Sequence, residues 1–86
     1  EAKLDRTLRG SAVSVHAAGS LVVVKTPPAA AQPVARALDE AALADIVGTI
    51  AGDDTVFVAT TSDRAARALT RRLMASLGRQ AVRAGA

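Results

Sequence analysis

Two adjacent carboxylates, Asp53 and Asp54, are the side chains of this 86-residue chain whose types and spacing point most directly to chemistry. They lie in the segment GTIAGDDT of residues 48–55, which the pattern predicts to be the turn of a hairpin. Two carboxylates on one turn could grip a guanidinium, which donates two parallel N–H bonds to a carboxylate. They also repel each other, so a bound cation would relieve a cost of the empty site. Gly-Asp-Asp is equally common turn chemistry, so spacing alone leaves a purely structural role open.

Catalysis by a nucleophile or a metal finds little support in the remaining residues. The chain has no cysteine, and no serine signature accompanies the single histidine, His16, which we interpret as a residue at the end of a strand. Asp39, Asp53 and Asp54 could bind Mg²⁺ or Ca²⁺ through oxygen, but adjacent carboxylates do not match the alternating ligand spacing of a calcium loop. No glycine-rich phosphate loop with a lysine is present. We therefore expect no enzyme activity, no catalytic residue and no metal site.

The length of 86 residues and the composition predict one small domain with a thin core. Of the 43 hydrophobic residues, 21 are alanine, which leaves 22 larger apolar side chains. Such a domain is marginal alone, so we expect contacts between subunits to supply part of its stability. No apolar run approaches the roughly 20 residues needed to cross a bilayer, so no membrane partner is expected. The absence of cysteine fits a reducing cytoplasm.

The charges are unevenly distributed along the chain. Residues 1–63 hold five basic and eight acidic side chains, whereas residues 64–86 hold six arginines and no acid. A basic segment of this kind suits contact with nucleic acid. It equally suits the solvated face of a helix. No aromatic residue that could stack on bases lies between the arginines, and this favours the solvated face.

Apolar periodicity predicts four strands and two long helices. The four strands cover residues 12–16, 21–24, 46–51 and 55–60, and the helices cover residues 29–42 and 62–77. Residues 1–10 form either a short helix or the remnant of a linker. The order ββαββα is typical of an α+β sandwich, in which a four-stranded antiparallel sheet has two helices packed on one face. The second face of the sheet has no cover within the chain, and if it is apolar, we expect another subunit to cover it.

The two long helices carry recognisable polar signals. Gln32, Arg36 and Asp39 recur at spacings of four and three residues, so they share one polar face of the first helix. The last helix has a good N-cap residue in Ser62 and a natural stop in Gly78. The residues beyond that glycine look like a loose tail.

The segment of residues 48–55, followed by β-branched residues, resembles the signature of bacterial arginine repressors, where it lies in the C-terminal domain. Upstream, VVKT leads into PAAAQ, and Ala35 and Leu38-Asp39 follow. This is similar to that family's strand, its Thr-x-Pro-Gly-x-Ala-x helix start and the aspartate one helix later. Ala29 stands where the family usually has glycine, a departure at the turn into the helix. The resemblance extends from about Val13 to Leu77.

The resemblance implies a domain that senses L-arginine and oligomerises. It implies trimers that pair into hexamers, with L-arginine bound between the trimers as a corepressor and with no other cofactor. The arginine-binding oligomerisation domain would span residues 11–80, with the linker or short helix at 1–10 and the loose tail at 81–86. The family's ligand residues correspond here to Gln32, Asp39, Thr49, Ala51, Asp53 and Asp54.

The resemblance also implies a role in transcription regulation, as part of a cytoplasmic repressor of arginine metabolism. A winged helix-turn-helix that reads operator DNA would precede Glu1 and is absent from this chain. A symmetric assembly would bring several copies of the Asp53-Asp54 turn together, and arginine would neutralise the concentrated negative charge. The alternative is an amino-acid-binding regulatory module of a metabolic enzyme, because such modules share this style of architecture.

Overall fold

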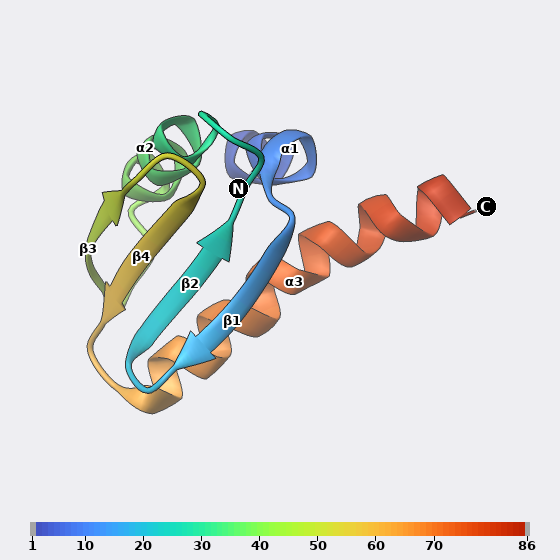
Figure 1. Cartoon of the computed structure of the whole chain (residues 1–86). Coiled ribbons are helices and arrows are strands. Elements are labelled where there is room, and N and C mark those ends of the chain that lie inside the picture. Colours follow the sequence, from blue (N-terminus) through green and yellow to red (C-terminus); the bar gives the residue numbers. More distant parts are fainter. Residues whose placement is uncertain (1, 86) are drawn as a thin grey trace.

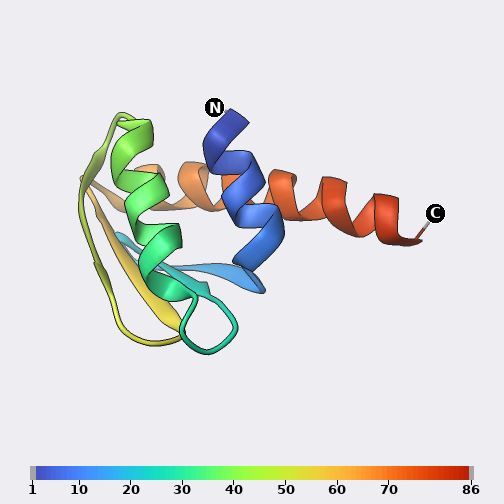
Figure 2. The same cartoon turned by 90° about the horizontal axis from the view of Figure 1, so that it is seen from above.

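The computed structural model describes the backbone of residues 2–85 and the side chains of residues 2–77. Within this part of the chain, four antiparallel strands form one sheet in the order β1-β2-β4-β3, and three helices lie on one of its faces (Figure 1, Figure 2). The predicted α+β fold and its ββαββα order are confirmed, with one further helix at the start. The elements are α1 (Ala2–Ser11), β1 (Ser14–Ala18), β2 (Leu21–Lys25), α2 (Ala31–Ala41), β3 (Ile46–Ala51), β4 (Thr55–Thr60) and α3 (Asp63–Gly85).

The alternation of side chains along the central strands builds the covered face of the sheet. Val22 and Val24 of β2, with Val56 and Val58 of β4, are fully buried at 0% exposure. Leu38 of α2 is buried to the same degree in the same core. Burying a side chain of this size stabilises a fold by about 1.5–3 kcal/mol, so these positions hold the helices on the sheet.

The opposite side of the sheet, which we call the open face, carries apolar side chains as well. The strand register places His16, Val23, Phe57 and Ile50 in one row, with one residue from each strand. Ile50 is 71% exposed and Phe57 is 46% exposed. The unbroken apolar run of residues 21–24 predicts a strand covered on both faces. In the structure its burial alternates instead, because the helices cover only one side.

Helix α1 belongs to the core, so helix is the correct one of the two alternatives for the start of the chain. Leu4 and Leu8 are spaced one turn apart and are 1% and 0% exposed. The helix packs against both α2 and α3. Asp5 accepts a hydrogen bond of 2.7 Å from the hydroxyl of Ser76 on α3, which fixes α1 along its polar side.

The first strand lies two residues further along the chain than predicted, whereas the second strand begins at Leu21 as predicted. Strand β1 covers Ser14–Ala18 rather than residues 12–16, so His16 lies in the middle of the strand and is exposed there. The turn is short because Ala18 pairs directly with Leu21. Gly19 takes a φ of 62°, the left-handed conformation that two-residue hairpin turns require.

Helix α2 is shorter than the predicted range of residues 29–42 because both ends of that range are left-handed. Ala29 has a φ of 67° and Ala42 a φ of 51°. An L-residue other than glycine in this conformation costs about 1–2 kcal/mol. The structure therefore explains why a glycine would suit the position of Ala29, where the sequence departs from the pattern it resembles.

Helix α3 begins as predicted and ends later than predicted. The hydroxyl of Ser62 accepts a hydrogen bond of 3.0 Å from the backbone N–H of Ala65, so Ser62 caps the helix. The backbone then continues through Gly78, the predicted stop, to Gly85, whereas a loose tail was expected at 81–86. A glycine inside a helix costs only about 1 kcal/mol, and strong helix formers flank this one. The side chains from residue 78 onward lie outside the described residues.

Candidate ligand-binding cleft

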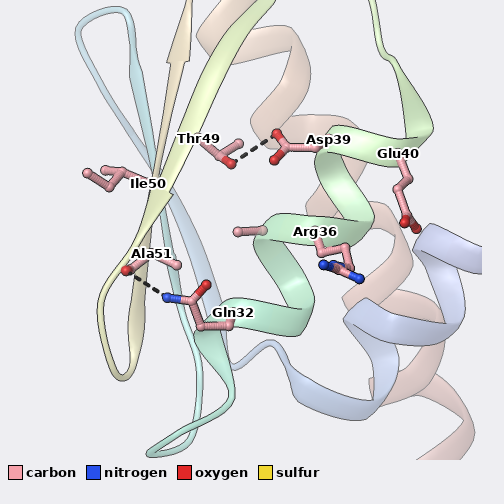
Figure 3. Close-up of a pocket in the computed structure, with 8 residues that line it drawn as sticks. Gln32, Arg36, Asp39, Glu40, Thr49, Ile50 and Ala51 are labelled. Carbon is pink, nitrogen blue, oxygen red and sulfur yellow. Dashed lines mark hydrogen bonds between the residues drawn. The ribbon is translucent and has the colours of Figure 1, made fainter.

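A cleft of about 630 Å³ lies between α2 and the edge strand β3 (Figure 3). Helical spacing brings successive turns of α2 to one wall, and β3 provides the other wall. The volume falls within the range of about 300–1,000 Å³ that is usual for small-molecule sites. The lining residues are Gln32, Ala35, Arg36, Asp39 and Glu40 from α2, and Thr49, Ile50 and Ala51 from β3.

Two hydrogen bonds join the walls of the cleft at its two ends. The hydroxyl of Thr49 donates to Oδ1 of Asp39 over 3.0 Å, and Nε2 of Gln32 donates to the carbonyl of Ala51 over 3.2 Å (Figure 3). These bonds orient the side chains of Gln32 and Asp39 toward β3. The wall between them therefore offers carboxylate, amide, hydroxyl and carbonyl oxygens, which are acceptors for a ligand rich in N–H groups.

The turn between β3 and β4 is fixed by backbone hydrogen bonds to the start of α2 and to the residue that follows β2. The carbonyl of Asp53 accepts from the N–H of Ala31 over 3.3 Å, and the carbonyl of Asp54 accepts from the N–H of Thr26 over 2.8 Å. No side chain caps α2, so the Asp53 carbonyl satisfies one of the N–H groups exposed at its first turn. Pro33, in the same turn, has no backbone N–H and therefore needs no partner at its own position.

The side chain of Asp54 has partners of its own within the chain. Its Oδ1 accepts a hydrogen bond of 2.9 Å from the hydroxyl of Thr55 and lies 3.7 Å from Nζ of Lys25. The hydroxyl of Thr55, and then the positive charge of Lys25, hold the pKa of the Asp54 carboxyl below its ordinary value. The carboxylate is therefore ionised at neutral pH and already carries a cationic neighbour.

Arg36 and Glu40 line the cleft although sequence reasoning did not include them among the ligand residues. Glu40 accepts a hydrogen bond of 2.7 Å from Nζ of Lys3, which belongs to α1. That bond and the positive charge of Lys3, together with a smaller effect of Arg36, lower the pKa of Glu40. The sequence contained a signal for both residues. Arg36 lies one helical turn after Gln32, and Glu40 directly follows Asp39 on the same helix.

The six residues implied by the resemblance divide into two groups in the structure. Gln32, Asp39, Thr49 and Ala51 line the cleft. Asp53 and Asp54 lie on the β3–β4 turn, both are exposed, and neither is among the residues lining the cleft. One chain therefore presents a cleft and, on the turn that follows Ala51, a pair of carboxylates that do not line it.

The described residues contain neither a candidate metal centre nor a helix that could span a membrane. Within them, no group of three or more histidine, aspartate or glutamate side chains could hold a metal ion. In the same part of the chain, none of the helices combines the length and the apolar character needed to cross a membrane.

The architecture is that of a small α+β domain with a polar cleft beside one edge of an antiparallel sheet. Residues 8–75 match the family described as "Arginine repressor, C-terminal domain", and the chain belongs to this family. The family was therefore correctly predicted from residues 48–55 and the start of α2. Arginine repressors are regulatory proteins rather than enzymes, which also agrees with the sequence analysis.

Individual relatives support the same assignment. The chain is 51% identical over 72 residues to an arginine repressor of Anaeromyxobacter sp. (strain Fw109-5), with 84% of this chain and 46% of the relative covered. It is 49% identical over 73 residues to an arginine repressor of Desulforudis audaxviator, with 85% and 49% covered. The arginine repressor of Pelotomaculum thermopropionicum is 42% identical over 72 residues, with 84% and 48% covered. The chain thus spans about half the length of these relatives.

Proposed function

We propose that this chain is the L-arginine-sensing, oligomerising part of a transcriptional repressor of arginine metabolism. L-Arginine acts as a corepressor that binds between trimers and stabilises their pairing into a hexamer. The observation that carries the proposal is the cleft between α2 and β3, where Gln32, Asp39, Thr49 and Ala51 come together in a member of the arginine repressor family.

The chemistry of the cleft suits one end of an arginine molecule. The ligand carries an α-ammonium group and a guanidinium, and both are donors only. The Asp39 carboxylate on α2 and the Ala51 carbonyl on β3 lie at opposite ends of the cleft and offer acceptors to such groups. Hydrogen bonds to charged groups are worth about 1.5–3 kcal/mol each, so two or three of them support specific binding.

The guanidinium is assigned to Asp53 and Asp54 of a neighbouring chain. In one chain these carboxylates are not among the residues that line the cleft. We therefore assign the ligand a place between two copies of the domain, one of which supplies the cleft and the other the carboxylates. Because the guanidinium makes two parallel bonds to a carboxylate, it would also offset the repulsion between the two adjacent aspartates.

Assembly and ligand binding are then linked. A ligand that binds only the assembled form shifts the equilibrium toward assembly, and assembly raises the affinity for the ligand by the same factor. The open face of the sheet, with Phe57 and Ile50 exposed, is the surface that we assign to contacts between subunits. Operator binding is assigned to the part of the relatives that this chain does not match, and the whole repressor is placed in the cytoplasm.

Calorimetric titration with L-arginine tests the ligand assignment. Asp39→Asn and Asp54→Asn each keep the size of the side chain and remove its charge. We expect either change to weaken L-arginine binding by at least about tenfold, because a charged hydrogen-bond partner is lost. Sedimentation of the ligand-free variants should match the unmodified protein, since neither residue belongs to the open face.

Asp45→Asn is the matched control. Asp45 is exposed, does not line the cleft, and has a φ of 71°, a conformation that asparagine adopts readily. L-Arginine should therefore bind this variant as it binds the unmodified protein. If Asp39→Asn and Asp54→Asn bound L-arginine as tightly as Asp45→Asn does, Asp39 and Asp54 would be ruled out as ligand residues. Thermal stabilisation by another amino acid but not by L-arginine would favour the regulatory module of a metabolic enzyme.

A further inference from the structure

Lys25 lies on the strand next to the β3–β4 turn, which carries two of the proposed arginine ligands. It is the last residue of β2 and pairs in register with Thr55, the first residue of β4. Its Nζ donates a hydrogen bond of 2.6 Å to the hydroxyl of Thr55, and that hydroxyl donates 2.9 Å to Oδ1 of Asp54. The same Nζ lies 3.7 Å from Oδ1 of Asp54. A lysine ammonium thus contacts the carboxylate both directly and through a hydroxyl.

We propose that Lys25 is a resident counter-ion of Asp54, which an arginine guanidinium must displace, and that it thereby sets the concentration at which L-arginine binds. The inference rests on the proposed function, in which Asp54 is a ligand residue. It adds a residue outside the six assigned ligand positions, and one that acts against binding rather than for it.

The difference between the two cations decides which one holds the carboxylate. A guanidinium donates two parallel hydrogen bonds in a fixed geometry, whereas an ammonium acts as a point charge on a flexible stem. The distance from Nζ of Lys25 to the Asp54 carboxylate is longer than a hydrogen bond, and the short hydrogen bond of Lys25 goes to the hydroxyl of Thr55. L-Arginine can therefore take over the carboxylate, while Lys25 keeps its bond to the hydroxyl.

The resident pair is weak enough to be displaced. The side chains of Lys25 and Asp54 are 46% and 51% exposed, and screening by solvent leaves an exposed ion pair with only a small free energy. An equal loss on ligand binding corresponds to an affinity up to about fivefold lower than it would be without the lysine. Lys25 also repels the net positive charge of L-arginine, which acts in the same direction.

Titration of Lys25→Met with L-arginine tests the proposal. Methionine keeps the length and the apolar part of the side chain and removes the charge. At low salt we expect the affinity of Lys25→Met to be about two- to fivefold higher than that of the unmodified protein. The difference should vanish near 1 M salt, where charges are screened within about 3 Å. Lys25→Arg keeps the charge and should bind no more tightly than the unmodified protein.

Arg67→Met is the matched control for net charge. Arg67 is exposed on α3, which lines no part of the cleft, and its removal changes the net charge of the chain by the same amount. We expect its affinity for L-arginine to be unchanged. A gain in Arg67→Met equal to that in Lys25→Met would reduce the effect to net charge and overturn the proposal.

The remaining outcomes separate this inference from the proposed function. Binding to the unmodified protein with unchanged or weaker binding to Lys25→Met overturns the role of Lys25 and leaves the arginine assignment in place. No binding of L-arginine to the unmodified protein overturns both. The resident pair has its own readout, because carbon-13 NMR of the Asp54 carboxyl should show a higher pKa in Lys25→Met than in the unmodified protein.

Discussion

The two faces of the sheet are built from the same four strands and serve different ends. On the covered face, Val22 and Val58 are at 0% exposure, buried beneath the helices. On the open face, the neighbouring residue Phe57 remains 46% exposed, and Ile50 on the next strand is 71% exposed. Folding of one chain accounts for the first set. The second set costs solubility in a single chain, and an exposed apolar patch of this kind is typical of an interaction surface.

The covered face also shows how a small domain with few large side chains stays folded. Of its 43 hydrophobic residues 21 are alanine, and many of the larger ones are buried in the core between the helices and the sheet. Leu4 and Leu8 of α1 extend this core beyond the sheet. The open face holds large apolar residues that do not belong to this core, which is why we assign that face to contacts between subunits.

The largest expected effect belongs to the covered side. Leu38 lies on α2 at 0% exposure, so Leu38→Ala should lower the free energy of unfolding by about 2–5 kcal/mol through lost burial and a cavity. Denaturant unfolding followed by circular dichroism measures the change. A loss below about 0.5 kcal/mol, the range usual for surface positions, would mean that the covered face does not carry the fold.

A smaller effect on folding, and a large one on association, is expected on the open face. Phe57→Ser should change the unfolding of a single chain by less than about 1 kcal/mol, because Phe57 is already 46% exposed. It should remove the dependence of the unfolding midpoint on protein concentration, which reports assembly. A concentration dependence equal to that of the unmodified protein would show that the open face is not the association surface.

The smallest effect concerns the ion pairs at the edges of the two layers. The folded-state pKa values of Glu40 and Asp54 are lowered below 4.5 and 3.8, so both groups stabilise the fold above their unfolded pKa values. This contribution is lost as the pH falls from about 4.5 through the lower folded values. Unfolding measured from pH 6 downward should show a shallower acid loss in a Glu40→Gln and Asp54→Asn double variant. An identical acid profile would contradict the pairing.

Much of the fold follows from the sequence because its signals are local and repeated. Apolar and polar positions alternate along β4, and apolar residues form a stripe along α2. Each pattern repeats often enough to predict which face of the element is buried. The two leucines of α1 form a pattern too short to separate a helix from a linker, and only packing against α2 and α3 decides between them. The helix passes Gly78 because flanking propensity outweighs one weak stop.

The site was predictable in part for the same reason. Helical spacing places Gln32 and Asp39 on one face, and the structure brings Thr49 and Ala51 to them. The separation of Asp53 and Asp54 from the cleft could not be predicted, because a turn fixes the backbone and leaves the direction of its side chains to tertiary contacts. Lys25 was missed because its partner, Asp54, lies on a turn 29 residues further along the chain.

Sedimentation velocity with and without L-arginine tests the central claim most directly, since the claim is that this ligand bridges chains. At a concentration where the ligand-free protein is not fully assembled, saturating L-arginine should increase the sedimenting mass, from trimer toward hexamer. The Asp54→Asn variant should show no such increase. A mass distribution that stays the same in the unmodified protein with and without L-arginine would contradict the account.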